Sequence, residues 1–168
     1  GKPDGSPQGA QREVMPGGFW LYGGRQVPHR AEVLGQRAAA TRPEIEQIML
    51  SAPDGLEGED LERALYLLRR RIEARATAAG LQHFYVCSLS ARSVIYKGMM
   101  LAEALGDFYP DLTDPRVEAN VALFHQRYST NTFPEWRLAQ PFRMLAHNGE
   151  INTLRGNANW MRSHEIRM

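Results

Sequence analysis

Cysteine and lysine are scarce in this sequence of 168 residues. The single cysteine, Cys87, excludes an intrachain disulfide and a zinc site built on several thiolates, and such usage fits a reducing cytoplasm. Lysine occurs only at Lys2 and Lys97, and the net charge of +1 provides no broad basic surface for nucleic acid or an anionic membrane. The sequence also lacks an apolar run long enough to span a bilayer and the pattern of a signal peptide. We therefore expect a cytoplasmic protein that binds neither nucleic acid nor a membrane.

What remains is the composition of an ordinary globular domain, with 43% hydrophobic and 23% charged residues. Residues 1–11 are rich in Gly, Pro, Ser and Gln, which is typical of a flexible segment. We expect a flexible or partial N-terminal segment over 1–18 and one folded domain over 19–168. Because the chain starts at Gly1 and stops at Met168, in or just after a helix-like segment, we expect this domain to be partial.

Strand-like and helix-like patterns alternate along the chain. Residues 54–80 carry the clearest helix signal, because apolar side chains recur there at helical spacing and form one face (Leu61, Leu65, Leu68 and Ile72). Further helices are expected over 32–39, 99–105 and 151–165, strands over 19–22, 43–50, 120–125 and 142–146, and a hairpin of two strands over 83–88 and 93–97. This mixture indicates an α+β layered domain.

A polar block over 125–132 follows one of these strand-like runs. The Arg127 guanidinium suits a carboxylate, which it can grip through two parallel hydrogen bonds, although a structural salt bridge is the more common role of a lone arginine. The hydroxyls of Ser129 and Thr130 can donate to the same ligand, or they can satisfy backbone groups of their own loop. The residues by themselves leave these alternatives open.

A second polar block, over 146–153, contains the pair Asn148-Gly149. Asn-Gly favours a tight hairpin turn, yet the residues that follow do not continue as a clean strand. Alternatively, the Asn148 side-chain amide and the Gly149 backbone N–H form the two donors of an oxyanion hole. The pattern alone does not decide between a turn and an oxyanion hole. Cys87, within the apolar run over 84–88, is expected to be a buried and unreactive thiol.

Six motifs occur in an order and spacing that resemble one family. They are Arg25-Gln26-Val27-Pro28, Ser88-Leu89-Ser90 with Tyr96-Lys97-Gly98-Met99-Met100, Phe108-Tyr109-Pro110-Asp111-Leu112, Ser129-Thr130-Asn131-Thr132-Phe133-Pro134, His147-Asn148-Gly149-Glu150-Ile151-Asn152-Thr153, and Gly156-Asn157 with Trp160-Met161. Over about residues 19–165 the sequence resembles the glutaminase domain of the glutamate synthase large subunit, which is a class II glutamine amidotransferase domain.

The resemblance implies an N-terminal-nucleophile (NTN) hydrolase fold, an αββα sandwich of two antiparallel sheets that is incomplete in this chain. It implies an enzyme that hydrolyses glutamine to glutamate and ammonia and uses the ammonia in the reductive amination of 2-oxoglutarate. By the same resemblance, Arg127 holds the α-carboxylate of glutamine, and Tyr128 and Thr130 line that pocket. Asn148 and Gly149 then form the oxyanion hole.

The sequence departs from the family pattern at the nucleophile. In the family this residue is a cysteine at the mature N-terminus, whose own α-amino group serves as the base. This chain begins with Gly1, and Cys87 occupies a strand-like position that does not match. We therefore expect an internal fragment that does not hydrolyse glutamine by itself.

The resemblance also implies partners and cofactors outside this chain. They are the central and FMN-barrel domains of the large subunit, a small electron-transfer subunit, FMN, an iron–sulfur cluster, and NADPH or ferredoxin as the electron donor. We expect no metal or cofactor site within the chain itself. Two alternatives stay open, namely the glutaminase domain of another class II amidotransferase and a non-catalytic domain that binds glutamine or supports assembly.

Overall fold

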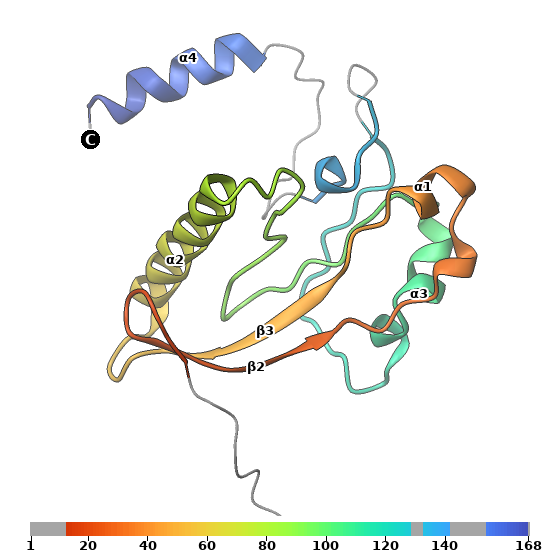
Figure 1. Cartoon of the computed structure of the whole chain (residues 1–168), viewed down its shortest axis with the longest axis horizontal. Helices are drawn as coiled ribbons and strands as arrows, with labels where there is room; N and C mark the ends of the chain where they lie inside the picture. The colour runs from red at the N-terminus through yellow and green to blue at the C-terminus, as the bar shows by residue number, and fades with distance from the viewer. Residues whose placement is uncertain (1–12, 129–132, 142–153, 168) are drawn as a thin grey trace, which may run out of the picture.

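The computed structural model describes residues 13–128, 133–141 and 154–167. The described strands form one antiparallel sheet in the order β1-β2-β3, made of β1 (Glu13–Met15), β2 (Phe19–Gln26) and β3 (Glu46–Ser51). The α-helices are α1 (Gln36–Ala40), α2 (Gly58–Ala78), α3 (Leu105–Phe108) and α4 (Leu154–Glu165), and the short 3-10 helices are η1 (Ala31–Val33), η2 (Ala102–Ala104), η3 (Pro110–Thr113) and η4 (Trp136–Leu138). In Figure 1, β2 and β3 run side by side, with α2 on one side and α1 and α3 gathered on the other, while α4 stands apart.

A tight turn joins β1 to β2. Gly17 and Gly18 adopt φ values of 91° and 79°, which residues with a side chain rarely tolerate, and the Gly18 N–H donates to the Met15 carbonyl at 3.1 Å. The turn places Phe19 opposite Met15 across the ladder, and the Phe19 side chain is only 1% exposed. The strand predicted over 19–22 is therefore confirmed, and it continues to Gln26.

Two apolar clusters build the core. The Leu68 cluster, made of Phe19, Leu65 and Leu68, joins the sheet to α2. The Phe108 cluster, made of Val27, Ala38, Phe108, Tyr109 and Trp136, joins the residues after β2 to α1, α3 and η4. Aromatic rings dominate the Phe108 cluster, in which the ring centroid of Phe108 lies 4.6 Å from that of Tyr109 and 5.8 Å from that of Trp136.

Helix α2 confirms the helix predicted over 54–80. Leu65 and Leu68 are 5% and 1% exposed on the predicted apolar face, whereas Leu67, which lies off that face, is 50% exposed. The helix ends at Ala78, and Gly80 follows with a positive φ of 79°. A glycine in this left-handed conformation is a common helix stop, because it needs no Cβ to be accommodated.

The hairpin predicted between residues 83 and 97 is wrong, because the structure has no strand there. In this segment, side-chain oxygens accept hydrogen bonds from backbone N–H groups, which in a strand ladder would be donated to the carbonyls of a neighbouring strand. Ser88 Oγ accepts from the Ile95 N–H at 3.2 Å, and the Ser90 hydroxyl donates to the Glu62 carboxylate of α2 at 2.9 Å. These contacts hold the segment against α2 as an irregular loop.

The remaining helices and strands predicted from the sequence are confirmed only in part. The strand predicted over 43–50 is confirmed by β3, and the helix predicted over 151–165 is confirmed by α4 from Leu154 onward. The helix predicted over 32–39 is divided into η1 and α1, and the one predicted over 99–105 appears as η2 followed by α3. The strand predicted over 120–125 is wrong, because those side chains are all exposed and no described strand pairs with them, while the strand predicted over 142–146 lies outside the described residues.

The mixture of helices with an antiparallel sheet agrees with the predicted α+β class. The described residues contain one sheet, whereas the expected αββα sandwich has two. The sandwich therefore stays a prediction.

Replacing Gly98 by alanine tests the tight packing around the Phe108 cluster. A methyl group at this position would lie 2.5 Å from Cζ3 of Trp136, whose ring is fixed within the cluster. We expect Gly98→Ala to lower the free energy of unfolding by about 1–3 kcal/mol, as overpacking typically does. Urea unfolding followed by tryptophan fluorescence measures this change.

Gly106→Ala is the matched control for that substitution. Gly106 lies within α3, where alanine is favoured over glycine, and its new methyl group would meet Thr113 at 3.4 Å. We expect its stability to be unchanged or slightly higher. Equal losses in the two variants would contradict a specific contact between Gly98 and Trp136.

Candidate active site

Tyr128, which the resemblance assigns to the substrate pocket, is anchored through its hydroxyl group. The hydroxyl donates to the Glu135 carbonyl at 3.1 Å, and the Gly98 carbonyl lies 3.5 Å from it. Because a phenol has one proton, the shorter contact is the main hydrogen bond. Burial raises the pKa of Tyr128 to about 12, so the hydroxyl remains a neutral donor at physiological pH.

Arg127 lies directly before this anchored residue, and its side chain is exposed. No acidic residue of the described ranges forms an ion pair with it. The structural salt bridge that competes with a ligand-binding role is therefore not seen within these ranges. An exposed guanidinium beside a fixed tyrosine is well placed to meet a carboxylate from solvent.

Helix α1 contacts the segment that follows the candidate pocket at two points. The Trp136 side chain is 4% exposed, and its indole N–H donates to the Ala38 carbonyl at 3.1 Å. The Arg37 guanidinium lies 4.0 Å from the ring centroid of Phe133, which is a cation–π distance. Glu135, whose carbonyl accepts the hydrogen bond from Tyr128, thus lies in sequence between Phe133 and Trp136, and the side chains of both contact α1.

Lys97 holds the far end of the same segment. Its Nζ donates to the Arg137 carbonyl at 2.8 Å and to the Ala139 carbonyl at 2.9 Å, and the residue is 8% exposed. Burial lowers the pKa of Lys97, because the charged amine has lost most of its water. The backbone at Lys97 is fixed as well, since the Tyr109 hydroxyl donates to its carbonyl at 2.9 Å.

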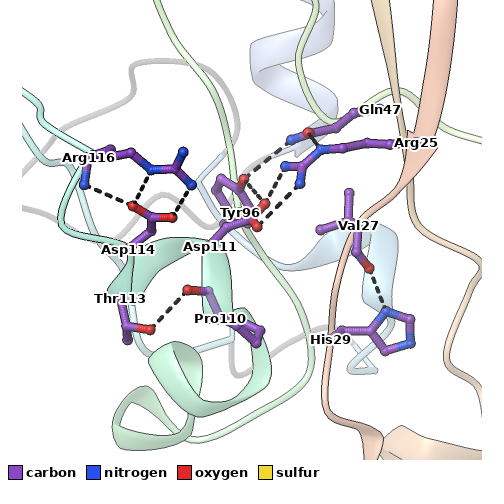
Figure 2. Close-up of polar contacts among 10 residues, drawn as sticks. All are labelled: Arg25, Val27, His29, Gln47, Tyr96, Pro110, Asp111, Thr113, Asp114 and Arg116. Carbon is purple, nitrogen blue, oxygen red and sulfur yellow. Dashed lines mark hydrogen bonds and ion pairs between the residues drawn. The ribbon is translucent and has the colours of Figure 1, made fainter.

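Figure 2 shows an ion pair that joins β2 to η3. Both terminal nitrogens of Arg25 donate to the Asp111 carboxylate, Nη1 to Oδ1 at 3.3 Å, while Arg25 Nε donates to Gln47 Oε1 at 2.9 Å. The Tyr96 hydroxyl donates to Asp111 Oδ2 at 2.8 Å. These donors, Arg25 first, hold the pKa of Asp111 below its ordinary value. Side chains from three of the six motifs, at positions 25, 96 and 111, therefore meet in one hydrogen-bonded network.

A cavity of about 630 Å³ lies between β3 and the loop over 83–97, and Cys87 is among its lining residues. The Cys87 side chain is half-buried, and burial raises the pKa of its thiol against the opposing charges of Lys97 and Arg69. A thiol with a raised pKa has little thiolate at neutral pH, and the thiolate is the nucleophile. The raised pKa agrees with the predicted inert role of Cys87, whereas its side chain is half-buried and not fully buried as predicted.

The structure places two of the five predicted site residues. Arg127 and Tyr128 are adjacent, and the Arg127 side chain is exposed while that of Tyr128 is half-buried. Thr130, Asn148 and Gly149 lie outside the described residues. Their approach to Arg127 and Tyr128 therefore stays a prediction.

Sequence reasoning missed the residues that support Tyr128. Lys97 and Gly98 belong to a motif that was noted for its resemblance alone, and Trp136 was not singled out. One signal was present, because Lys97 is the sole lysine after Lys2 and follows an apolar stretch. A charged residue in such a stretch indicates either a functional role or a buried set of acceptors.

The described ranges contain no group of three or more His, Cys, Asp or Glu side chains arranged to hold a metal ion. None of the helices described for this chain combines the length and the apolar character that crossing a membrane requires. The group that the described site offers to a polar organic ligand is the guanidinium of Arg127, because the single proton of the Tyr128 phenol is already donated to the Glu135 carbonyl.

Comparison with known families gives the class of this protein. The family model of the class II glutamine amidotransferases matches residues 6–168, and the chain belongs to that family. Relatives of the chain include glutamate synthases from several organisms. The chain is 58% identical over 158 residues to the NADPH glutamate synthase large chain of Azospirillum brasilense, a match that covers 94% of this chain and 10% of the relative.

Ferredoxin-dependent relatives give the same result. Ferredoxin-dependent glutamate synthase 2 of Synechocystis sp. is 49% identical over 145 residues, which is 86% of this chain and 9% of the relative. The chloroplastic ferredoxin-dependent glutamate synthase of Oryza sativa subsp. japonica is 48% identical over 149 residues, which is 88% of this chain and 9% of the relative. The chain therefore spans about a tenth of the length of the curated relatives it matches.

Removing the carboxylate of Asp111 tests the network of Figure 2. The folded-state pKa of Asp111 is below its ordinary value of 3.8, so the ion pair stabilises the fold above that pH and the stabilisation is lost as the pH falls through the folded-state pKa. We expect Asp111→Asn to lower the free energy of unfolding by about 1 kcal/mol at pH 7, since the pair is partly solvated. The difference from the wild type should become smaller in acid, as measured by urea unfolding at pH 7 and pH 3.

Asp114→Asn is the control for this pH dependence. Within the described ranges the Asp114 carboxylate pairs with Arg116, its neighbour two residues along, and the Arg116 side chain is 88% exposed. We expect a smaller loss at pH 7 than for Asp111→Asn. A loss at Asp111 that persists unchanged at pH 3 would show that packing, and not the ion pair, explains the effect.

Proposed function

We propose that this chain forms part of the glutaminase domain of a glutamate synthase. This enzyme hydrolyses glutamine and uses the ammonia in the reductive amination of 2-oxoglutarate to glutamate. The observation that carries the proposal is the 58% identity over 158 residues with the glutamate synthase large chain of Azospirillum brasilense. Ferredoxin-dependent glutamate synthases that are 45–49% identical over 86–88% of this chain support the same assignment.

In this proposal Arg127 binds the α-carboxylate of glutamine. A guanidinium matches a carboxylate with two parallel N–H···O bonds, which fix the orientation of the ligand as well as its charge. Tyr128 and Thr130 line the same pocket. The exposure of Arg127 and the hydrogen bond from Tyr128 to the Glu135 carbonyl support this role, because they present the cation to solvent from an ordered base.

Asn148 and Gly149 supply the oxyanion hole. When a nucleophile adds to the side-chain amide carbon of glutamine, the carbonyl oxygen becomes an anion. The Asn148 side-chain N–H and the Gly149 backbone N–H donate to that oxygen, and the amide nitrogen leaves as ammonia after it has received a proton. Cys87 is not the nucleophile in this proposal, because its thiol is half-buried and has a raised pKa.

The proposal also covers the fold of the domain and the parts of the enzyme that lie outside this chain. Residues 19–168 belong to an NTN-hydrolase αββα sandwich, preceded by the segment over 1–18. The central and FMN-barrel domains, a small electron-transfer subunit, FMN, and NADPH or ferredoxin lie outside this chain. An iron–sulfur cluster takes several thiolates, and this sequence with its single cysteine does not fit one, so the cluster is placed elsewhere in the enzyme. The same cysteine usage supports a cytoplasmic location.

Arg127→Ala in the complete enzyme tests the carboxylate site. Loss of the charged hydrogen bonds should raise the KM for glutamine by about ten- to a hundredfold, since such bonds contribute about 1.5–3 kcal/mol. Steady-state glutamate release measures the KM. Arg71→Ala, at an exposed position of α2, is the matched control and should leave the KM unchanged. An unchanged KM in Arg127→Ala would remove Arg127 from the binding site.

Asn148→Ala tests the oxyanion hole. We expect kcat to fall by about 10²–10³-fold with a small change in KM, because this donor acts on the charge that develops during the reaction. Rapid-quench measurement of glutamate release gives the rate. Cys87→Ala is the control, and its rate should equal that of the wild type. A large loss in Cys87→Ala would instead assign the reaction to that thiol.

The same assays separate the proposal from its two alternatives. Glutamine hydrolysis that is not coupled to 2-oxoglutarate would favour another class II amidotransferase. Glutamine binding without hydrolysis in the wild type would favour a non-catalytic binding domain.

A further inference from the structure

Two charged residues are buried in the described part of the chain, Glu62 and Lys97. Glu62 has a clear structural task, because its carboxylate accepts hydrogen bonds from the Ser90 hydroxyl and the Ala91 N–H at 2.9 and 2.8 Å. Lys97 points to a different part of the molecule, the turn that contains η4. Nothing in the proposed reaction uses it directly.

The two acceptors of Lys97 belong to one turn. Its ammonium donates to the Arg137 and Ala139 carbonyls at 2.8 and 2.9 Å, at the end of η4. Carbonyls at a helix end lack donors within the helix, and Ala139 is only 4% exposed. Lys97 therefore provides donors that the helix does not supply, and at the buried Ala139 carbonyl solvent does not supply one well either.

The residue next to Lys97 contacts the other end of the same turn. The Gly98 carbonyl lies 3.5 Å from the Tyr128 hydroxyl, which donates to the Glu135 carbonyl at 3.1 Å. The backbone of Gly98 packs so closely on Trp136 that a methyl group there would lie 2.5 Å from the ring. Contacts from positions 97 and 98 thus enclose the segment over 135–139 and reach Tyr128.

From this geometry we infer that Lys97 is a positioning residue for glutamine binding. Its ammonium fixes the segment over 135–139, and the Glu135 carbonyl of that segment fixes Tyr128 and the adjacent Arg127. The inference rests on the proposed function, in which Arg127 binds the α-carboxylate of glutamine. Lys97 itself does not touch the substrate.

The expected effect falls on binding. Without the ammonium, the two carbonyls lose their donors and the segment over 135–139 adopts other positions. Only a fraction of the molecules then presents Arg127 correctly, and the apparent affinity falls by that fraction. Arg127 holds the α-carboxylate of the substrate and not the bond that reacts, so we expect kcat to change less than KM.

The test uses the complete enzyme with Lys97→Met, which keeps the length of the side chain and removes its charge, and Lys97→Arg, which keeps a buried cation with several N–H donors. We expect Lys97→Met to raise the KM for glutamine by about tenfold while kcat stays within about threefold, and Lys97→Arg to restore the KM to within about threefold of the wild type. Hydrogen exchange followed by mass spectrometry should become faster in peptides covering 127–128 and 135–139. Exchange in the β2–β3 ladder should not change.

Two patterns of results would contradict the positioning role of Lys97. An unchanged KM with unchanged exchange over 135–139 would overturn the positioning role. Faster exchange throughout the protein, including the β2–β3 ladder, would also overturn the positioning role if kcat and KM were affected alike and Lys97→Arg gave no recovery. That pattern reports a general loss of structure. If Lys97→Met does not accumulate as folded protein, Lys97→Gln, which keeps two N–H donors without the charge, is judged by the same measurements.

The assays also separate this inference from the proposed function. A wild-type enzyme that does not release glutamate from glutamine contradicts the proposed function, whatever the variants do. A wild-type enzyme that is active, paired with a Lys97→Met variant of unchanged KM, contradicts the positioning role alone. The exchange measurement needs no activity and tests the anchor in either case.

Discussion

A charged amine in a protein interior is tolerated only where other groups replace the water it has lost, and Lys97 meets this requirement through two carbonyls of a single turn. That requirement restricts where the turn can lie. Trp136 belongs to the same turn, and its side chain packs in the Phe108 cluster. Tyr128 is then fixed by the Glu135 carbonyl at the start of the same segment. The described part of the candidate site therefore depends on how one buried charge is satisfied.

The Arg25–Asp111 pair performs a different task nearby. Its side chains are 38% and 18% exposed, so solvent weakens the attraction and the pair orients elements more than it stabilises them. Tyr96 donates to this carboxylate, while the next residue, Lys97, donates to the turn at η4. Two consecutive residues thus connect η3 and η4, one through a partly solvated network and one through a buried cation.

Local patterns predicted some elements well and others badly, for physical reasons. Helix α2 was predictable because its apolar spacing is a property of neighbouring residues, and burial of Leu65 and Leu68 follows from that spacing. The hairpin between 83 and 97 was predicted wrongly because serine side chains and Glu62 bind the backbone in place of a strand partner. The run over 120–125 has the composition of a strand, yet a strand requires a neighbour, and composition does not reveal whether one is there.

Residue type and spacing alone determined the apolar face of α2, the improbability of Cys87 as a nucleophile and the motifs that place the chain among the class II glutamine amidotransferases. They left the role of Arg127 open between a carboxylate site and a structural salt bridge, and only the resemblance to the family assigned Arg127 and Tyr128 to a substrate pocket. Only the tertiary structure decided the partners of Lys97, 40 and 42 positions away, and of Arg25, 86 positions away. Such pairs form because burial removes water from groups that are distant in sequence, and that competition depends on the whole fold.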